Sequence, residues 1–413
     1  MEGSVQGFFD VHNMRRAPAA VHGGATPYHS DGMDTLRFVV AAAIALVAVG
    51  ALLQLAWGYL DLPSLNDVPG VGRDAPRVSI VVAARDEERH IAAATAALLA
   101  QDYPDFELIV VDDRSVDGTP AILGALPRGR LQVVRVNALP PGWIGKNHAL
   151  HVGAQRATGT LLLFTDGDVM LRPDALSRAV RLMTVERADH LTVAPGLVLP
   201  GWPLALVVNY FMMWFLLWLR PWKARDPRSG RFVGIGAFNL VSAAAYRAVG
   251  GHERIALRPD DDLMLGKILK TAGHRQLLAT GERLIRVEWY GSLGEMARGL
   301  RKNAFAGLKY SVSLTLGAVA GNLALAVWPF AAVWLTSGWE RAFYATAAVA
   351  QMIAYGGTAL AHRARPWLAV LYPVASLLFV WILSAAVTRT LRRRGIEWRG
   401  TFYSLDELRT NRV

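Results

Sequence analysis

The chain has 413 residues, no cysteine and a formal net charge of +11. Its hydrophobic share of 53% and mean hydropathy of +0.26 exclude an ordinary soluble protein, so we expect membrane-spanning segments. The lack of cysteine excludes disulfides and cysteine-based metal sites. Because no aromatic and basic motif accompanies the positive charge, we expect it to flank membrane segments and attract anionic lipid rather than bind nucleic acid.

The first apolar segment follows a polar leader. Residues 1–35 are expected to be disordered, and Met33 is an alternative start. Residues 38–60 carry no charge, and at about 1.5 Å rise per residue they can cross a hydrocarbon core of roughly 30 Å. No basic start or small-residue cleavage site marks a signal peptide, so residues 36–60 are predicted to be an uncleaved transmembrane anchor.

Residues 76–305 alternate short apolar strands with helix-like stretches, which is typical of an α/β domain with a largely parallel sheet. Strands are expected at 77–84, 107–111 and 160–164, and helices at 87–100 and 263–272. Acidic residues follow each strand and open the last helix. Ligands of open α/β sheets bind beyond the carboxyl ends of the strands, so these acids are candidate site residues. Capping, turns and the helix dipole are alternative reasons for acids at such positions.

Asp166 and Asp168 stand directly after the third strand. Two carboxylates one residue apart can bind Mg²⁺ or Mn²⁺, directly or through water, while phosphate oxygens take the remaining positions. An ion there would stabilise a departing nucleoside diphosphate. An isolated Asp-x-Asp also occurs in surface turns, but the apolar strand before this one favours a site.

Within the α/β region, residues 204–219 are apolar and make up most of a segment at about 203–222. A membrane crossing there would put Asp168 and Asp262 on opposite sides of the bilayer. Trp214, Trp218 and Trp222 recur every fourth residue, as on one face of a helix. The segment is therefore predicted to be an interfacial helix at the level of the lipid headgroups.

The C-terminal third has charge-free stretches at 310–339, 342–361 and 366–388, and residues 310–388 are predicted to be transmembrane helices, the second being the weakest. Residues 389–413 form a basic tail that we expect in the cytoplasm. Three crossings after a cytoplasmic catalytic domain would put this tail outside, against the positive-inside rule. A re-entrant segment would remove the conflict.

Four segments, at 78–88, 110–119, 145–150 and 164–168, resemble in their order the family 2 glycosyltransferases. The resemblance implies the GT-A fold, a Rossmann-like mixed sheet that binds nucleotide sugars. Less specifically, residues 141–146 and 397–403 resemble the membrane-bound branch that glycosylates hopanoids, carotenoid acids or related lipids. Ala83 and Asp86 depart from the family pattern, which usually has Pro and Asn there.

The resemblance implies a hexosyltransferase that moves one sugar from a nucleotide sugar, with a UDP-sugar favoured, to a membrane lipid with inversion. The protein would be integral to the bacterial inner (plasma) membrane, with its catalytic domain in the cytoplasm. The implied nucleotide-sugar-binding residues are Ala84, Asp86, Glu87, Asp112, Asp113, Lys146, Asp166 and Asp168, of which Asp166 and Asp168 hold the divalent metal. Asp262 would be the general base, and Asp261 is the alternative after a one-residue slip.

Three further residues are implied on the acceptor and phosphate side: Gly236, Arg298 and Lys302. Basic residues just before a membrane segment are also ordinary topology determinants. A polysaccharide synthase is an alternative function, but its Gln-x-x-Arg-Trp motif is absent from residues 295–305. A catalytically silent lipid-binding scaffold on the same fold is another, and the intact series of acids argues against it.

Overall fold

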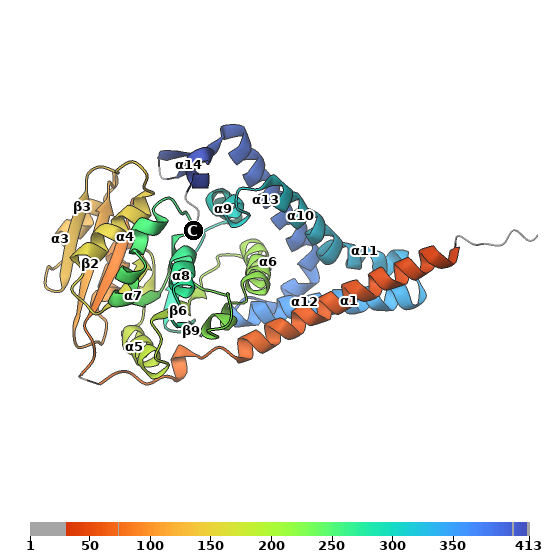
Figure 1. Ribbon diagram of the computed structural model, residues 1–413, viewed down its shortest axis with the longest axis horizontal. Coiled ribbons are helices and arrows are strands. Elements are labelled where there is room, and N and C mark those ends of the chain that lie inside the picture. Colours follow the sequence, from red (N-terminus) through yellow and green to blue (C-terminus); the bar gives the residue numbers. More distant parts are fainter. Residues whose placement is uncertain (1–29, 73, 399, 411–413) are drawn as a thin grey trace, which may run out of the picture.

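The computed structural model describes residues 30–410 except 73 and 399, so most of the expected leader lies outside the described residues. An α/β domain occupies one side of the molecule, and long helices extend from it on the other (Figure 1). Helix α1 spans Ser30–Leu60 and therefore begins before residue 36, the expected start of the anchor.

The α/β domain is built on a seven-stranded mixed sheet in the order β3-β2-β1-β4-β8-β6-β9. The first four strands are parallel, β8 runs antiparallel to both of its neighbours, and β9 is parallel to β6. The expected α/β class is thus confirmed, with the sheet mixed. The strands are β1 (Val78–Ala84), β2 (Phe106–Asp113), β3 (Leu131–Val136), β4 (Leu161–Asp166), β6 (His190–Ala194), β8 (Asn239–Ser242) and β9 (Gln276–Thr280).

The central strands are mostly apolar because helices cover both faces of the sheet. On β1, Ile80 and Val82 point to the face covered by α2 (Ile91–Leu99), α3 (Thr119–Ala125) and α5 (Ala175–Val185). Val81 points to the other face, which packs against α4 (Gly145–Arg156) and α8 (Asp261–Thr271). The expected helix at 87–100 is shorter, since its first residues form a turn.

The register of the sheet brings the predicted acids together. Ala84 pairs with Asp112 across β1 and β2, and Ala83 pairs with Asp166 across β1 and β4. The strand ends therefore lie side by side at one edge. The remaining elements of the domain are β5 (Met170–Leu171), β7 (Gly196–Leu197), α7 (Ala243–Ala248), β10 (Ile285–Val287) and α9 (Leu293–Gly307).

Within the described residues, four helical segments are long and apolar enough to cross a membrane: Gly32–Leu60, Trp202–Arg225, Val312–Leu335 and Pro366–Arg393. The third consists of α10 (Val312–Asn322), a π-helical turn (Leu323–Val327) and α11 (Trp328–Leu335). Helix α12 (Gly338–Ala361), the stretch expected to be the weakest span, is not among them and lies beside α1 (Figure 1). Helix α13 spans Tyr372–Arg393.

The second apolar segment contains α6 (Trp202–Leu219), which is inserted between β6 and β8. These two strands pair with each other, so the chain leaves the sheet and returns to it on the same side. The prediction that Trp214, Trp218 and Trp222 share one face of a helix is wrong. Trp218 is exposed, whereas Trp222 is buried against Gly58, because the helix ends at Leu219 and Arg220 takes a left-handed conformation with φ of 49°.

Two glycines allow α8 to lie directly against the preceding segment. A Cβ on Gly266 would stand 1.8 Å from the carbonyl oxygen of Val233, and a Cβ on Gly234 would stand 1.9 Å from that of Asp262. Both neighbours are backbone atoms and cannot rotate away. The absence of side chains here fixes where the first turn of α8, with its acids, meets the sheet edge.

We expect Gly266→Ala to separate α8 from Val233 and to cost about 1–3 kcal/mol, as overpacking does. Thermal unfolding in detergent should show a lowered midpoint. Gly124→Ala is the matched control, because Gly124 is a helical glycine with open space at the Cβ position. Equal midpoints for the two variants would contradict the close approach.

Candidate active site

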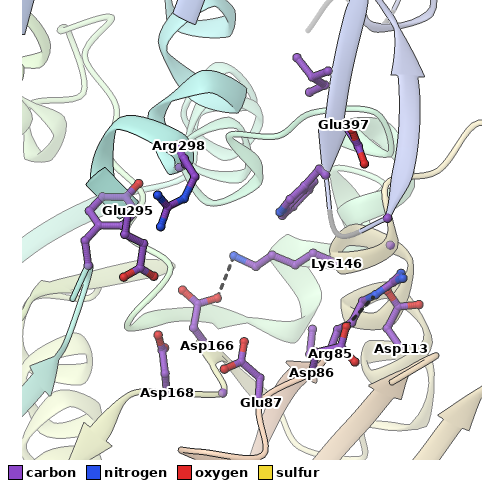
Figure 2. A pocket seen from close by; sticks show the side chains of 18 of the residues that line it. Arg85, Asp86, Glu87, Asp113, Lys146, Asp166, Asp168, Glu295, Arg298 and Glu397 are labelled. Atoms are coloured by element: carbon purple, nitrogen blue, oxygen red, sulfur yellow. Dashed lines mark ion pairs between the residues drawn. The ribbon is translucent and has the colours of Figure 1, made fainter. Parts of the chain in front are cut away.

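A cavity of about 1000 Å³ lies at the carboxyl ends of β1, β2 and β4. Its floor carries Glu87, Lys146, Asp166 and Asp168, and Arg298 projects from α9 on the opposite side (Figure 2). The helical end of the chain closes it, through α13 and a hairpin formed by β11 (Gly395–Trp398) and β12 (Thr401–Ser404). The cavity thus joins the strand ends to the helical part of the molecule.

Lys146 is the second residue of α4, which begins at the sheet edge. Its Nζ lies 2.8 Å from Asp166 Oδ1 and 3.3 Å from Asp261 Oδ2. Burial opposes its charge, but Asp166, Asp261 and Asp262 outweigh burial and raise the pKa of Lys146. The ammonium therefore stays charged and holds two of the predicted acidic clusters together.

Asp168 lies beside Asp166 and Glu87, and burial followed by these two charges raises the pKa of its carboxyl to about 7. Its Oδ1 is buried without a hydrogen-bond partner. Among the residues that the structure describes, no three carboxylate or imidazole groups stand ready to hold an ion by themselves. The Asp166 and Asp168 pair fits a divalent cation whose other ligands come from a bound substrate.

Asp261 and Asp262 open α8 and meet a second, water-sized cavity. Asp262 Oδ2 accepts a hydrogen bond of 2.6 Å from the Gly236 amide, and its Oδ1 accepts one of 2.8 Å from the Leu263 amide. Burial raises the pKa of Asp261 to about 7 against the pull of Lys146. Asp261 is buried and Asp262 is half-buried, so Asp262 is the more exposed of the two residues.

Gly236 is the point at which these groups converge. A Cβ there would lie 2.7 Å from Asp166 Oδ2 and 3.4 Å from both Asp262 Oδ2 and Lys146 Nζ. Lys146 and Asp166 line the large and the small cavity alike, whereas Asp262 lines only the small one. The Lys146 to Asp166 ion pair therefore stands between Asp262 and the large cavity.

Asp113 lies at the other end of the large cavity. Its carboxylate accepts hydrogen bonds of 2.7 and 3.0 Å from Arg114, and Arg85 Nη1 lies 3.7 Å from its Oδ2. A Cβ on Gly145 would stand 2.2 Å from the same Oδ2, so the start of α4 needs glycine to approach this carboxylate. The predicted Ala84 also lines this cavity.

Asp112 and Asp86 have local roles in the structure. Asp112 is buried, accepts a hydrogen bond of 3.1 Å from the Ser115 amide and does not line the cavity. Asp86 lines the cavity rim with φ of 54°, and its Oδ1 accepts a hydrogen bond of 2.9 Å from the Val116 amide. The Asp112 carboxylate therefore lies in a local turn and not in the cavity that the other predicted acids of the strand ends line.

The sequence did not identify Asn147 as a site residue. Its buried Nδ2 donates to the carbonyl oxygens of Ile255 and Arg258 at 2.8 and 2.9 Å, which ties α4 to the loop before α8. Its position directly after Lys146 was the only feature of the sequence that could have indicated a role for Asn147. The hairpin was also unexpected, because residues 389–413 were predicted to be a basic tail and the resemblance at 397–403 implied no strands. Of the predicted basic residues, Arg298 lines the cavity, and the Lys302 side chain lies outside the described part.

Residues 79–225 match the model of the family "Glycosyl transferase family 2". The chain is similar to a "Beta-monoglucosyldiacylglycerol synthase" of Nostoc sp., with 34% identity over 164 residues, 35% of this chain and 35% of that protein. It is 24% identical to a "4,4'-diaponeurosporenoate glycosyltransferase" of Staphylococcus aureus over 219 residues, 52% of this chain and 56% of that protein. A "Succinoglycan biosynthesis protein ExoO" of Rhizobium meliloti is 35% identical over 114 residues, which are 28% of this chain and 30% of that protein.

Among solved structures, the mannosyltransferase PcManGT from Pyrobaculum calidifontis, in complex with GDP-Man and Mn²⁺, is similar with a TM-score of 0.49 and 21% identity. The similarity covers 87% of this chain and 99% of that one. The chain thus spans only 35% of the length of the glucosyldiacylglycerol synthase and 56% of that of the diaponeurosporenoate glycosyltransferase.

We expect Lys146→Met to lower the thermal midpoint, because it leaves Asp166 and Asp261 without their cation. Since the lysine side chain is 23% exposed, the loss should be about 2 kcal/mol, between the ranges for exposed and buried pairs. Thermal unfolding of the variant in detergent measures it. Adding Asp261→Asn to Lys146→Met should recover part of the loss, and a double variant less stable than the single one would contradict this account.

Proposed function

The chain carries a domain of Glycosyl transferase family 2, and on this premise we propose that it transfers one sugar from a nucleotide sugar to a membrane lipid with inversion at the anomeric carbon. A UDP-sugar is the favoured donor. The observation that carries the proposal is the large cavity. Strand-end carboxylates of the GT-A domain line one side of it, and residues at the ends of long apolar helices line the other. Donor and lipid can meet there.

The donor would lie along the cavity floor. The nucleoside would occupy the end at Arg85 and Asp113, and the diphosphate would lie at Lys146 and the start of α4. An ammonium beside a helix N-terminus is a favourable partner for phosphate oxygens. A volume of about 1000 Å³ accommodates a ligand of this size. The sugar would then extend toward Asp168.

Asp166 and Asp168 would hold a divalent ion, Mg²⁺ or Mn²⁺, together with the diphosphate. When bound, such an ion offsets the charge that grows on the departing diphosphate. The orphan Oδ1 of Asp168 and the crowding of Asp166, Asp168 and Glu87 support this assignment. Lys146 pairs with Asp166 in the structure, so it would turn to the diphosphate as the donor binds.

That movement of Lys146 would also open the path to Asp262. The acceptor hydroxyl oxygen attacks the anomeric carbon, its proton passes to the Asp262 carboxylate, and the bond to the diphosphate breaks with its electron pair on the leaving oxygen. The two amides that bond to Asp262 orient its carboxylate. Asp261 would remain an ion-pair partner of Lys146 as the ammonium turns toward the diphosphate.

The lipid would approach along the helices. Trp289 and Tyr290 line the cavity, and the Trp289 ring lies 5.3 Å from that of Phe211 on α6. Helix α6 packs against α9 and α13 and would lie at the membrane interface, since both of its ends return to the sheet. The relatives named for glucosyldiacylglycerol and diaponeurosporenoate support a lipid acceptor.

The hairpin after α13 bounds the same cavity as the strand ends, so both would lie on one side of the membrane, which we propose is the cytoplasmic side of the bacterial inner membrane. The chain between α9 and the hairpin would then cross an even number of times. This removes the conflict with the positive-inside rule that three crossings create. Residues 312–335 would lead outward, and either α12 or α13 would return.

We expect Asp262→Asn to bind the donor like the wild type but to lose at least about 100-fold in transfer, because general-base catalysis contributes on that order. Purified full-length protein with Mn²⁺ and a panel of UDP- and GDP-sugars would be titrated by calorimetry and then assayed for transfer to extracted lipids.

Asp261→Asn is the matched comparison, and it should leave more transfer activity than Asp262→Asn. The reverse order would assign the base to Asp261. EDTA should weaken donor binding by the wild type. If the wild type binds no nucleotide sugar, the transferase proposal fails and a silent scaffold is favoured.

The lack of native cysteine permits single-cysteine labelling. We expect Arg128→Cys and Asp406→Cys, both at exposed positions, to be protected from an impermeant maleimide in whole cells, and Ser337→Cys, between α11 and α12, to be labelled. All three should react in lysed cells. Labelling of only one of Arg128→Cys and Asp406→Cys in whole cells would contradict the even number of crossings.

A further inference from the structure

The C-terminal hairpin belongs to the cavity rather than to a free tail. Strands β11 and β12 pair from Gly395 opposite Ser404 to Trp398 opposite Thr401. The hairpin follows α13 directly and is followed by α14 (Leu405–Thr410). Hence the segment farthest from the strand ends in sequence lies against them in space.

A hydrophobic cluster holds the hairpin in place. Ile396 and Tyr403 are buried together with Ile144, just before α4, and Phe305 of α9. Leu405 and Leu408 extend the cluster. The hairpin is thus anchored to the catalytic domain at the residue that precedes Gly145 and Lys146.

The pairing divides the side chains of the hairpin between two faces, and Glu397, on the face of Phe402, lines the cavity as well. Ile396 stands opposite Tyr403 and Trp398 stands opposite Thr401, so these four residues share one face of the ribbon. Trp398 and Tyr403 line the cavity, whereas Phe402 is on the other face, is 56% exposed and does not line it. The hairpin therefore offers an aromatic wall to the cavity and a solvent-facing aromatic as an internal comparison.

This wall covers one end of the cavity. A Cβ on Gly400, at the tip, would lie 3.8 Å from Nη2 of Arg85, and Arg85 pairs with Asp113. Burial raises the pKa of Tyr403, and the Gly145 amide and Arg114 near its hydroxyl oppose that rise. Every one of these neighbours lies at the Asp113 end, apart from Asp168 and Asp262.

We propose that the C-terminal hairpin completes the nucleoside site, with Trp398 packing against the base or ribose of the donor and Tyr403 positioning the start of α4. The inference rests on the proposed function, because it concerns the donor of that reaction. An indole face stacks on any nucleobase and adds contact area that a shallow strand-end site lacks. Tyr403 would act through Gly145, which sets the location of Lys146.

The arrangement predicts that the hairpin and the acids act on different parts of the donor. The hairpin touches the nucleoside end and the acids touch the sugar end, so loss of Trp398 should weaken binding of UDP and of the intact donor by the same factor. It should raise KM and leave kcat nearly unchanged, because the contact is equal in ground and transition states. Asp262→Asn should do the opposite.

The test uses purified full-length protein titrated with UDP and with GDP in Mn²⁺. We expect Trp398→Leu to weaken binding of the nucleotide that the wild type prefers by about tenfold, and Trp398→Phe to restore most of it, since a ring can still stack. Phe402→Leu is the matched control and should bind like the wild type. Leucine and phenylalanine both keep apolar volume, so we expect the three variants to fold. Their thermal midpoints check this.

Tyr403→Phe keeps the ring and removes the hydroxyl near the Gly145 amide. If Tyr403 positions α4, this variant should weaken UDP binding, with its diphosphate, more than binding of uridine alone. Equal affinities of Trp398→Leu and Phe402→Leu would overturn the inference while leaving the proposed function intact. If the wild type binds neither UDP nor GDP, the proposed function fails first, and the inference fails with it.

Discussion

The candidate site depends on one ammonium group among several carboxylates. Strand ends and a helix start place Asp166, Asp261 and Asp262 around the same point, and like charges in a partly buried place repel. Lys146 makes this arrangement possible, at 2.8 Å from Asp166 and 3.3 Å from Asp261. The same charge is a partner for phosphate. A bound diphosphate would therefore compete with Asp166 for Lys146, and binding of the donor would change the connection between the two cavities.

The close approach that glycines allow is a second constraint on the site. Gly236 and Gly145 leave room for carboxylates, while Gly234 and Gly266 bring backbone segments into contact. In each case the neighbour would collide with any Cβ. These positions form a continuous path from α8 through Gly236 to the start of α4, so the acids and the lysine are positioned mainly by backbone approach. Asn147 completes that path through its bonds to carbonyl oxygens before α8.

Local pattern was enough to predict the sheet and the acids at its edge, because alternation of apolar strands and helices determines where strand ends meet. It was not enough for side-chain direction. Asp112 and Asp113 are adjacent in sequence, yet one faces the 112–115 turn and the other faces the cavity. Trp222 left the expected tryptophan face because the helix ended before it. The hairpin was missed for another reason: its contacts join residues near 400 to residues near 85 and 145, and no short-range period records such pairings.

Contacts of that kind give the helical half of the molecule a part in the site. Helix α13 packs against α6 and α9, and the hairpin that follows it reaches Arg85 and Ile144. Any shift of α13 relative to the sheet would therefore move the hairpin at the place where the nucleoside is proposed to lie. Helix α6 carries Phe211, whose ring lies against that of Trp289, and α6 and α9 line the approach proposed for the lipid. A lipid seated among these helices would therefore stabilise the arrangement that holds the hairpin over the donor, and the donor would favour the same arrangement for the lipid, since coupling between two sites is reciprocal.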